Sequence, residues 1–135
     1  MAGVRTSLQD RITQVDMLAP VSTATLGIES GTFDARSYPH GSRFIACFSV
    51  GVQTEGTLTY SVVDCDTSGG TYTATATTYG TLATSTSATD EVTLVQGFEV
   101  DPARPFIKLK TVETVSVTTA VPVHQYILVI PPAVV

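Results

Sequence analysis

With 135 residues, 43% of them hydrophobic, the chain can form one compact domain with a core of its own, which excludes a globally disordered protein. Charged residues make up only 14% of the chain, against roughly 25% in ordinary soluble domains, so the composition indicates that part of the surface is hidden in an assembly. The formal net charge is −5 and the seven cations form no basic stripe, which argues against direct binding of nucleic acid.

The first twenty residues are predicted to form an N-terminal segment ahead of a β-sandwich domain at 21–135. Four apolar residues in it recur at helical spacing: Leu8, Ile12, Val15 and Leu18. This spacing predicts a short helix that Pro20 would end, and the alternative is an extended arm that orders on a neighbouring molecule. The segment lacks the apolar run of a signal peptide, and no run in the chain reaches the ~18 apolar residues of a membrane span. We therefore expect synthesis in a cytoplasm and no membrane partner.

Strand signals begin with residues 23–28 and continue with a short strand near Phe33, which leads into a turn at 39–41. Residues 43–52, RFIACFSVGV, form a long apolar run in which both alternating sets of side chains are largely apolar. Such a run is typical of a central strand that is buried on both faces.

The next signals predict a hairpin turn at 54–56, a half-buried strand at 57–65 and a glycine-containing turn at 66–70. A threonine-rich stretch, GGTYTATATTYGTLATSTSAT, follows. Its first half alternates small inward residues with threonines up to Thr77, which predicts a strand with a polar outer row. Its second half is less regular and is interpreted as a loop or as a short strand with a long connection.

In the remaining third of the chain, Val92, Leu94 and Val95 are predicted to point inward from one strand. A further strand is predicted to start at Phe106 and to have Lys108 on the same face as Phe106. Val123–Ile130 is the last predicted strand. About eight turn-separated strands without alternating helices indicate an all-β fold, an antiparallel β-sandwich of jelly-roll type.

No catalytic or metal-binding motif stands out in the sequence. The two histidines, His40 and His124, and the two cysteines, Cys47 and Cys65, lie outside the usual spacings of metal ligands. Asp64 and its neighbours resemble a fragment of a calcium loop without the ligands that should follow. We expect no enzyme activity, no cofactor, no metal site and no disulfide.

Two segments, 30–73 and 105–130, carry a resemblance to a known family. A strand of the form G-x-L-T-Y-S-V is followed by an acidic turn and a second glycine-tyrosine strand, and here VDCDTSGGTYT occupies that place. In this order of strands and turns the chain resembles the capsid cement, or decoration, proteins of tailed bacteriophages. The resemblance implies a jelly-roll sandwich on the outside of an icosahedral head, made in the host cytoplasm and then part of the virion. It implies the major capsid protein and further copies, as a dimer or trimer, as partners.

The apolar chain ends are the candidate contact surfaces for these partners. The residues concerned are Leu8, Ile12, Val15, Leu18, Ile130, Val134 and Val135. The alternative is that they complete the core of the domain itself. Two other functions stay open on the sequence: another virion component, such as a head–tail connector or tail protein, and a carbohydrate-binding β-sandwich module.

Overall fold

Two antiparallel sheets form the protein, and the computed structural model describes residues 11–23, 28–73, 81–88, 92–115 and 121–132 of it. The described strands are β1 (Thr13–Thr23), β2 (Ile28–Glu29), β3 (Phe33–Asp34), β4 (Arg43–Val50), β5 (Gln53–Cys65), β6 (Thr81–Ala88), β7 (Val92–Phe98), β8 (Phe106–Val115) and β9 (Val121–Ile130). A short 3₁₀ helix, η1 (Ala35–Ser37), follows β3. The predicted antiparallel β-sandwich is thus confirmed.

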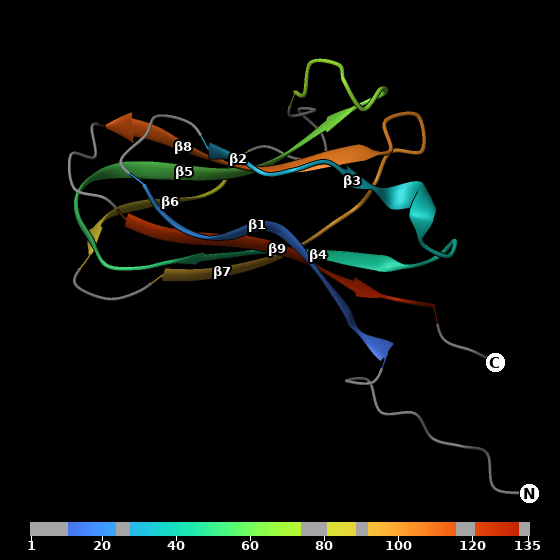
Figure 1. Cartoon of the computed structure of the whole chain (residues 1–135), viewed down its shortest axis with the longest axis horizontal. Helices are drawn as coiled ribbons and strands as arrows, with labels where there is room; N and C mark the ends of the chain where they lie inside the picture. The colour runs from blue at the N-terminus through green and yellow to red at the C-terminus, as the bar shows by residue number, and fades with distance from the viewer. Residues whose placement is uncertain (1–10, 24–27, 74–80, 89–91, 116–120, 133–135) are drawn as a thin grey trace, which may run out of the picture.

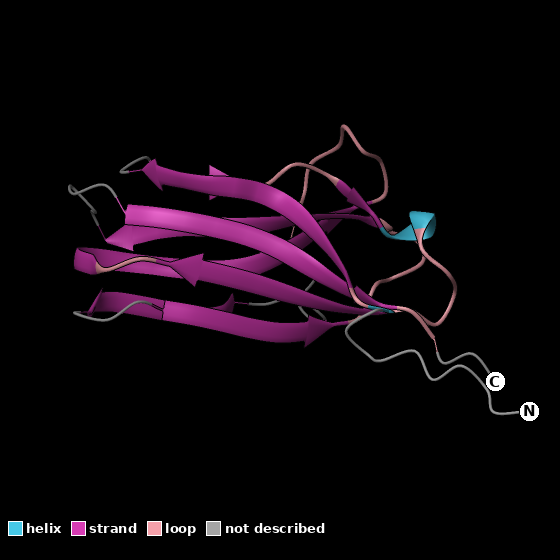
Figure 2. Ribbon diagram, turned by 60° about the horizontal axis from the view of Figure 1, so that its bottom comes forward, coloured by secondary structure: helices cyan, strands magenta, loops and turns pink. Residues whose placement is uncertain are grey.

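The strand order shows that the chain crosses repeatedly between the layers. The first sheet has the order β1-β9-β4-β7 and the second has the order β2-β8-β5-β6, with β3 also paired to β8. Figures 1 and 2 show the two layers lying face to face. Consecutive strands β4 and β5 belong to different sheets and are linked through Gly51 and Val52. Such crossings are typical of a jelly roll and not of a simple meander.

Strict alternation along the central strands builds the core between the sheets. In β9 every second residue is buried, from Val121 to Val129, and β8 buries Ile107 and Leu109 in the same way. Phe48 of the first sheet meets Tyr60 of the second with ring centroids 5.4 Å apart. Both rings are almost completely buried, so they tie the layers together at the centre of the molecule.

One polar contact also crosses the core. Gln125 of β9 is fully buried, and its Nε2 donates to the hydroxyl of Thr111 on β8 over 2.7 Å. A buried amide is costly unless it is hydrogen-bonded, so this contact favours one relative placement of the two sheets.

The helix predicted in the N-terminal segment is wrong from Thr13 onward, because these residues belong to β1. They pair with β9 of the same chain, starting at Thr13 with Val129. Within β1, Val15 and Met17 face the core while Gln14 is exposed, so a two-residue period prevails over the helical spacing. The edge of β9 provides backbone hydrogen-bonding partners, which override the weak helical preference. β1 also runs across the boundary predicted at residue 20.

The hairpin turn predicted at 54–56 is also wrong. Residues Gln53–Cys65 form one strand, and Gly56 adopts a positive φ of 78° inside it. The pairing with β6 shifts register between Gln53 and Thr57, so the glycine marks an irregularity of the strand. The chain reverses instead at Gly51 and Val52.

Two further predictions can be checked in the threonine-rich and following segments. The loop alternative for the second threonine-rich half is wrong over Thr81–Ala88, which is β6 and pairs with β5. The strand predicted up to Thr77 is described only as far as Thr73, and the rest of it lies outside the described residues. Val95 does not point inward: its side chain is 57% exposed, because its neighbour Leu94 occupies the inner face.

Candidate interaction surfaces

The histidines and cysteines do not meet in a metal site. His40 lies in the turn after η1, and Cys47 and Cys65 are separate free thiols, both buried. Within the part of the chain that the structure describes, no three His, Cys, Asp or Glu side chains are grouped so as to hold a metal ion. Burial raises the pKa of the Cys47 thiol, which disfavours the nucleophilic thiolate there.

One histidine contacts a carboxylate, on the outer side of the first sheet. His124 Nε2 lies 3.2 Å from Asp16 Oδ1, and hydrogen bonds from Gln14 and His124 lower the pKa of Asp16. Ser49 is the register partner of His124 on β4. No hydrogen bond joins the Ser49 hydroxyl to His124 among the described contacts, and nucleophilic catalysis depends on that bond.

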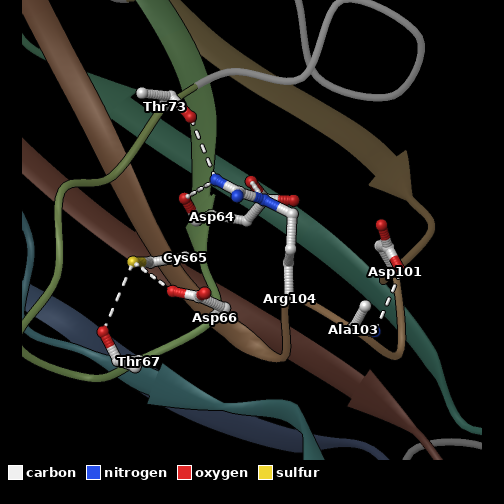
Figure 3. Close-up of polar contacts among 8 residues, drawn as sticks. All are labelled: Asp64, Cys65, Asp66, Thr67, Thr73, Asp101, Ala103 and Arg104. Atoms are coloured by element: carbon white, nitrogen blue, oxygen red, sulfur yellow. Dashed lines mark hydrogen bonds and ion pairs between the residues drawn. The ribbon is translucent and has the colours of Figure 1, made fainter.

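The acidic segment that resembles a calcium loop is organised around an arginine (Figure 3). Arg104 Nε donates to Asp64 Oδ1 over 2.7 Å, and its Nη2 donates to the Asp64 carbonyl and to Thr73 Oγ1. Asp64 is fully buried, whereas Asp66 is exposed in the turn that follows. The hydrogen bond to Asp64 raises the pKa of Arg104, as expected for a charge-assisted pair. The cluster therefore holds the turn between β5 and Thr73 in place. Asp64, the first carboxylate of the segment, is already paired with Arg104.

An open groove lies at the end of the sandwich where β4 begins and β9 ends; we call it the terminal groove. It is lined by residues 35–36, 38–45, 97–100, 102, 105 and 130. Four aromatic rings lie beneath and beside it. Tyr38 stacks on the buried Phe33 with centroids 5.1 Å apart, and Phe44 packs against Phe33 and Phe98 at 5.5 and 5.9 Å. The cluster gives the groove a partly buried aromatic wall that can pack against apolar groups of a partner.

Charged and polar side chains lie around this aromatic wall. Arg36 forms a 3.0 Å ion pair with Asp34 and lies over the Phe106 ring, 4.7 Å from its centroid. Arg43 is exposed at the start of β4, and His40 is exposed in the adjoining turn. Glu99 also lines the groove, so the rim carries charges of both signs.

Both described chain ends lie beside the terminal groove. Arg11 donates from Nη2 to the carbonyl of Pro131 over 3.2 Å and also to the carbonyl of Pro132. Pro132 lies next to Gly41, where an added Cβ would be 3.4 Å from the proline Cβ. Figure 1 shows the blue start of β1 and the red end of β9 at the same end of the sandwich as η1. The described part of the chain therefore begins and ends next to the groove.

The predicted contact residues have different positions in the structure. Val15 is partly buried and packs on the core, and Ile12 is partly buried just before β1. Leu18 lies in β1 with its backbone paired to Gln125. Ile130 is partly buried at the end of β9 and lines the terminal groove. The remaining three, Leu8, Val134 and Val135, lie outside the described residues.

A second surface was missed by the sequence analysis, although its signal was present in the apolar runs of β4 and β9. It is the outer side of the first sheet, and we call the following residues the outer apolar face: Ile45, Cys47, Val95, Tyr126 and Leu128. Cys47 is the register partner of both Val95 and Tyr126, so these three lie in one row across the sheet. Ile45 pairs with Leu128 in the adjacent row. Desolvation raises the pKa of Tyr126, and the neighbouring Cys47 contributes to the rise.

Comparison with known proteins bears on the fold. No family model matches the chain, and no curated protein matches it. Five chains of solved structures match, one of them in a structure of infectious bursal disease virus, Gx strain. The similarity to that chain has a TM-score of 0.54 at 13% sequence identity and covers 90% of the present chain. It covers 32% of the viral chain, so the present chain spans about a third of its length. The two share a β-sandwich fold.

Among the described residues there is no helix of the length and apolar character needed to cross a membrane.

Proposed function

We propose that this chain is a structural, non-catalytic protein of a bacteriophage virion that binds the outside of the head and cements neighbouring major capsid subunits. The sandwich fold and its likeness to a chain of a virus structure support a role in a virion. The order of strands and turns supports the narrower assignment through its resemblance to cement proteins. Such a protein acts by occupying contacts between subunits and has no need of a reaction centre.

The observation that carries the proposal is the convergence of two chain ends on one groove. Arg11 and Pro132 lie beside the terminal groove, whose wall contains Tyr38 and Phe44. An attachment site made of aromatic rings, cations and chain ends at one pole can hold two neighbouring subunits while the rest of the sandwich projects outward. Because many copies bind one particle, modest single contacts add up to firm attachment.

The test is the number and place of copies in purified virions of the phage that encodes the chain. We expect a copy number comparable to that of the major capsid protein, by quantitative gel analysis, and density on the head surface by electron cryomicroscopy. A handful of copies at one vertex would contradict the proposal and favour a head–tail connector. Binding of the isolated chain to glycans, with none to heads, would favour a carbohydrate-binding module.

A charge reversal tests the groove itself. Heads prepared without the chain are mixed with the purified wild-type protein, with Arg43→Glu at the groove or with Lys110→Glu on the second sheet. We expect Arg43→Glu to weaken head binding at least tenfold and Lys110→Glu to leave it within about twofold, since the altered lysine lies away from the groove. Equal effects of both substitutions would show that net charge, and not the groove, governs attachment.

A further inference from the structure

The described sheet edges of the sandwich differ in how they are protected against further strand pairing. An edge strand turns every second residue's backbone N–H and C=O away from its neighbour, and natural sheets protect such edges with very short strands, charges, prolines or bulges. β2 and β3 are two residues long each, and β1 contains Asp16 and Pro20 and shifts register twice against β9. The pairing of β6 with β5 is also shifted twice. Each of these edges thus carries at least one protective device.

The remaining edge strand, β7, has none of these devices. Its seven residues, VTLVQGF, include no charged residue and no proline. They pair with β4 from Val92 to Phe98 without a register shift, and within the described residues β7 pairs with β4 alone. We call the side of this strand that faces away from β4 the β7 edge. A regular, uncharged edge of this kind is the template that strand addition by a partner requires.

The side chains of β7 show that space is left beside it. On the inner side, Leu94 and Phe98 are only partly buried, although both pack against the core. On the outer side, Val95 is 57% exposed and lies at the end of the row that contains Tyr126 and Cys47. A strand added at the β7 edge would cover apolar side chains on both faces of the sheet. We therefore expect its own central side chains to be apolar, because cross-strand neighbours are in contact.

We propose that the β7 edge binds an extended segment of a different protein, which adds to the first sheet as a further strand. The inference deepens the proposed function, because it names the mode of contact, and it rests on that function only for the identity of the partner. β7 also leads into the terminal groove, since Gly97 and Phe98 line that groove. A segment paired with β7 would therefore continue into the groove at which the head is proposed to bind.

The charges at the two ends of β7 indicate which segments it would accept. Asp90 and Glu91 precede the strand in the sequence, and Glu99 and Asp101 follow it. Arg43, at the start of the neighbouring β4, is a cation at one of these ends only. Acidic residues therefore outnumber basic ones along this edge. A segment with lysine or arginine at both of its ends would complement them.

The same charges disfavour a second copy of this chain at the β7 edge. An antiparallel copy of β7 centred on Val95 would bring Glu91 of each copy opposite Glu99 of the other. Like charges directly opposite each other in a ladder are destabilising. The expected occupant is therefore a strand of another protein that is apolar at its centre and basic at its ends.

Two short peptides of valine and threonine test the edge, one with a lysine at each end and one with a glutamate at each end. Each peptide is added to the full chain, and amide hydrogen exchange is followed residue by residue by nuclear magnetic resonance. The lysine peptide should slow exchange at alternate residues of β7, those whose N–H faces away from β4, and leave β1 unchanged. A contact with side chains alone would not produce this alternation. The glutamate peptide should bind at least tenfold more weakly than the lysine peptide.

Two exposed valines provide matched variants. Val95 lies on β7, whereas Val52, 46% exposed, lies in the link between β4 and β5. Val95→Lys should weaken binding of the lysine peptide at least tenfold, because a lysine on an edge strand is a device that natural sheets use against strand addition. Val52→Lys should change the same binding less than twofold. Both positions tolerate a lysine because neither side chain is packed in the core.

Unchanged exchange of the β7 amides in the presence of the lysine peptide would overturn the inference, as would equal effects of the two substitutions. Binding of the same proteins to heads prepared without the chain separates this inference from the proposed function. If the wild type and Val95→Lys bind heads equally well, strand addition at β7 is refuted and the capsid role is not. If the wild type binds the lysine peptide along β7 and does not bind heads, only the capsid role is refuted.

Discussion

Arg104 and Asp64 lie 40 residues apart in the chain and form a 2.7 Å ion pair that joins the loop before β8 to the end of β5. The carboxylate is completely buried, and 27% of the arginine side chain is exposed. The same guanidinium also holds Thr73, so three separate segments depend on one side chain. Ion pairs of this kind are costly to break, because the remaining charge stays buried.

Arg104→Met should therefore lower the free energy of unfolding substantially. We expect the loss to be larger than for a surface pair, because the Asp64 carboxylate would stay buried without its cation. Arg36→Met is the matched control, since its pair with Asp34 lies at the surface and should contribute little to stability. Urea unfolding of both variants measures the difference. A loss from Arg104→Met no larger than from Arg36→Met would contradict a structural role for the Arg104 cluster.

Two adjacent glycines in the turn after β5 should respond very differently to alanine. A Cβ at Gly70 would clash with Cys65 Sγ and Thr67 Oγ1, whereas a Cβ at Gly69 would meet no atom within 4 Å. Gly70→Ala should cost about 1–3 kcal/mol through forced displacement of the turn. Gly69→Ala should stay within about 0.5 kcal/mol of the wild type. Thermal unfolding of the two variants provides the comparison, and similar melting temperatures would show that the turn yields freely.

The buried contact between Gln125 and Thr111 should show strong coupling in a double-mutant cycle. Thr111→Val leaves the buried Gln125 amide without its partner and should cost about 1–3 kcal/mol. Gln125→Met also removes Oε1, a buried acceptor with no partner among the described residues. The double variant should therefore lose clearly less stability than the two single losses combined. Additive losses in chemical denaturation would mean that the contact across the sheets contributes nothing of its own.

Acid should weaken the cap of η1. The side-chain hydrogen bond from Arg36 lowers the pKa of Asp34 below its usual 3.8. A carboxyl with a lowered folded pKa stabilises the protein above its unfolded pKa, and this contribution is lost as the pH falls through the folded value. The stability difference between wild type and Asp34→Asn should thus be constant from neutral pH down to about 5 and shrink below 3.8. Urea titrations across this pH range measure the stability difference between the two proteins. A difference that grows in acid would contradict the prediction.

The fold class followed from the sequence because alternation of apolar and polar residues is a local signal. β5 and β8 show it clearly, with Tyr60 and Leu109 buried and the residues on either side of each less buried. The same signal could not assign the N-terminal segment, because Val15 has a helical spacing to Ile12 and a two-residue spacing to Met17. Its strand depends on pairing with β9, more than one hundred residues later. The hairpin turn at 54–56 was predicted wrongly for a similar reason, since a glycine such as Gly56 is typical of either a turn or an irregular strand.

The surfaces were less predictable than the fold. The terminal groove arises because β3, β4 and β7 bring Phe33, Phe44 and Phe98 together from distant parts of the chain. No local pattern indicates that meeting. The outer apolar face did leave a signal, since the run around Cys47 predicted burial on both sides. What the sequence could not tell is that the described part of the chain covers only the inner side of this strand.

The shared position of the two chain ends has a mechanical consequence. β1 and β9 are antiparallel, and Arg11 joins the start of one to Pro131 just past the end of the other. A force that pulls these ends apart acts first on the pair Thr13 and Val129 and then on each following pair in turn. The hydrogen bonds of the ladder are perpendicular to the strands, so they open one after another, as in a zipper, and do not share the load. Tension between the two ends would thus peel β1 from the sheet at low force.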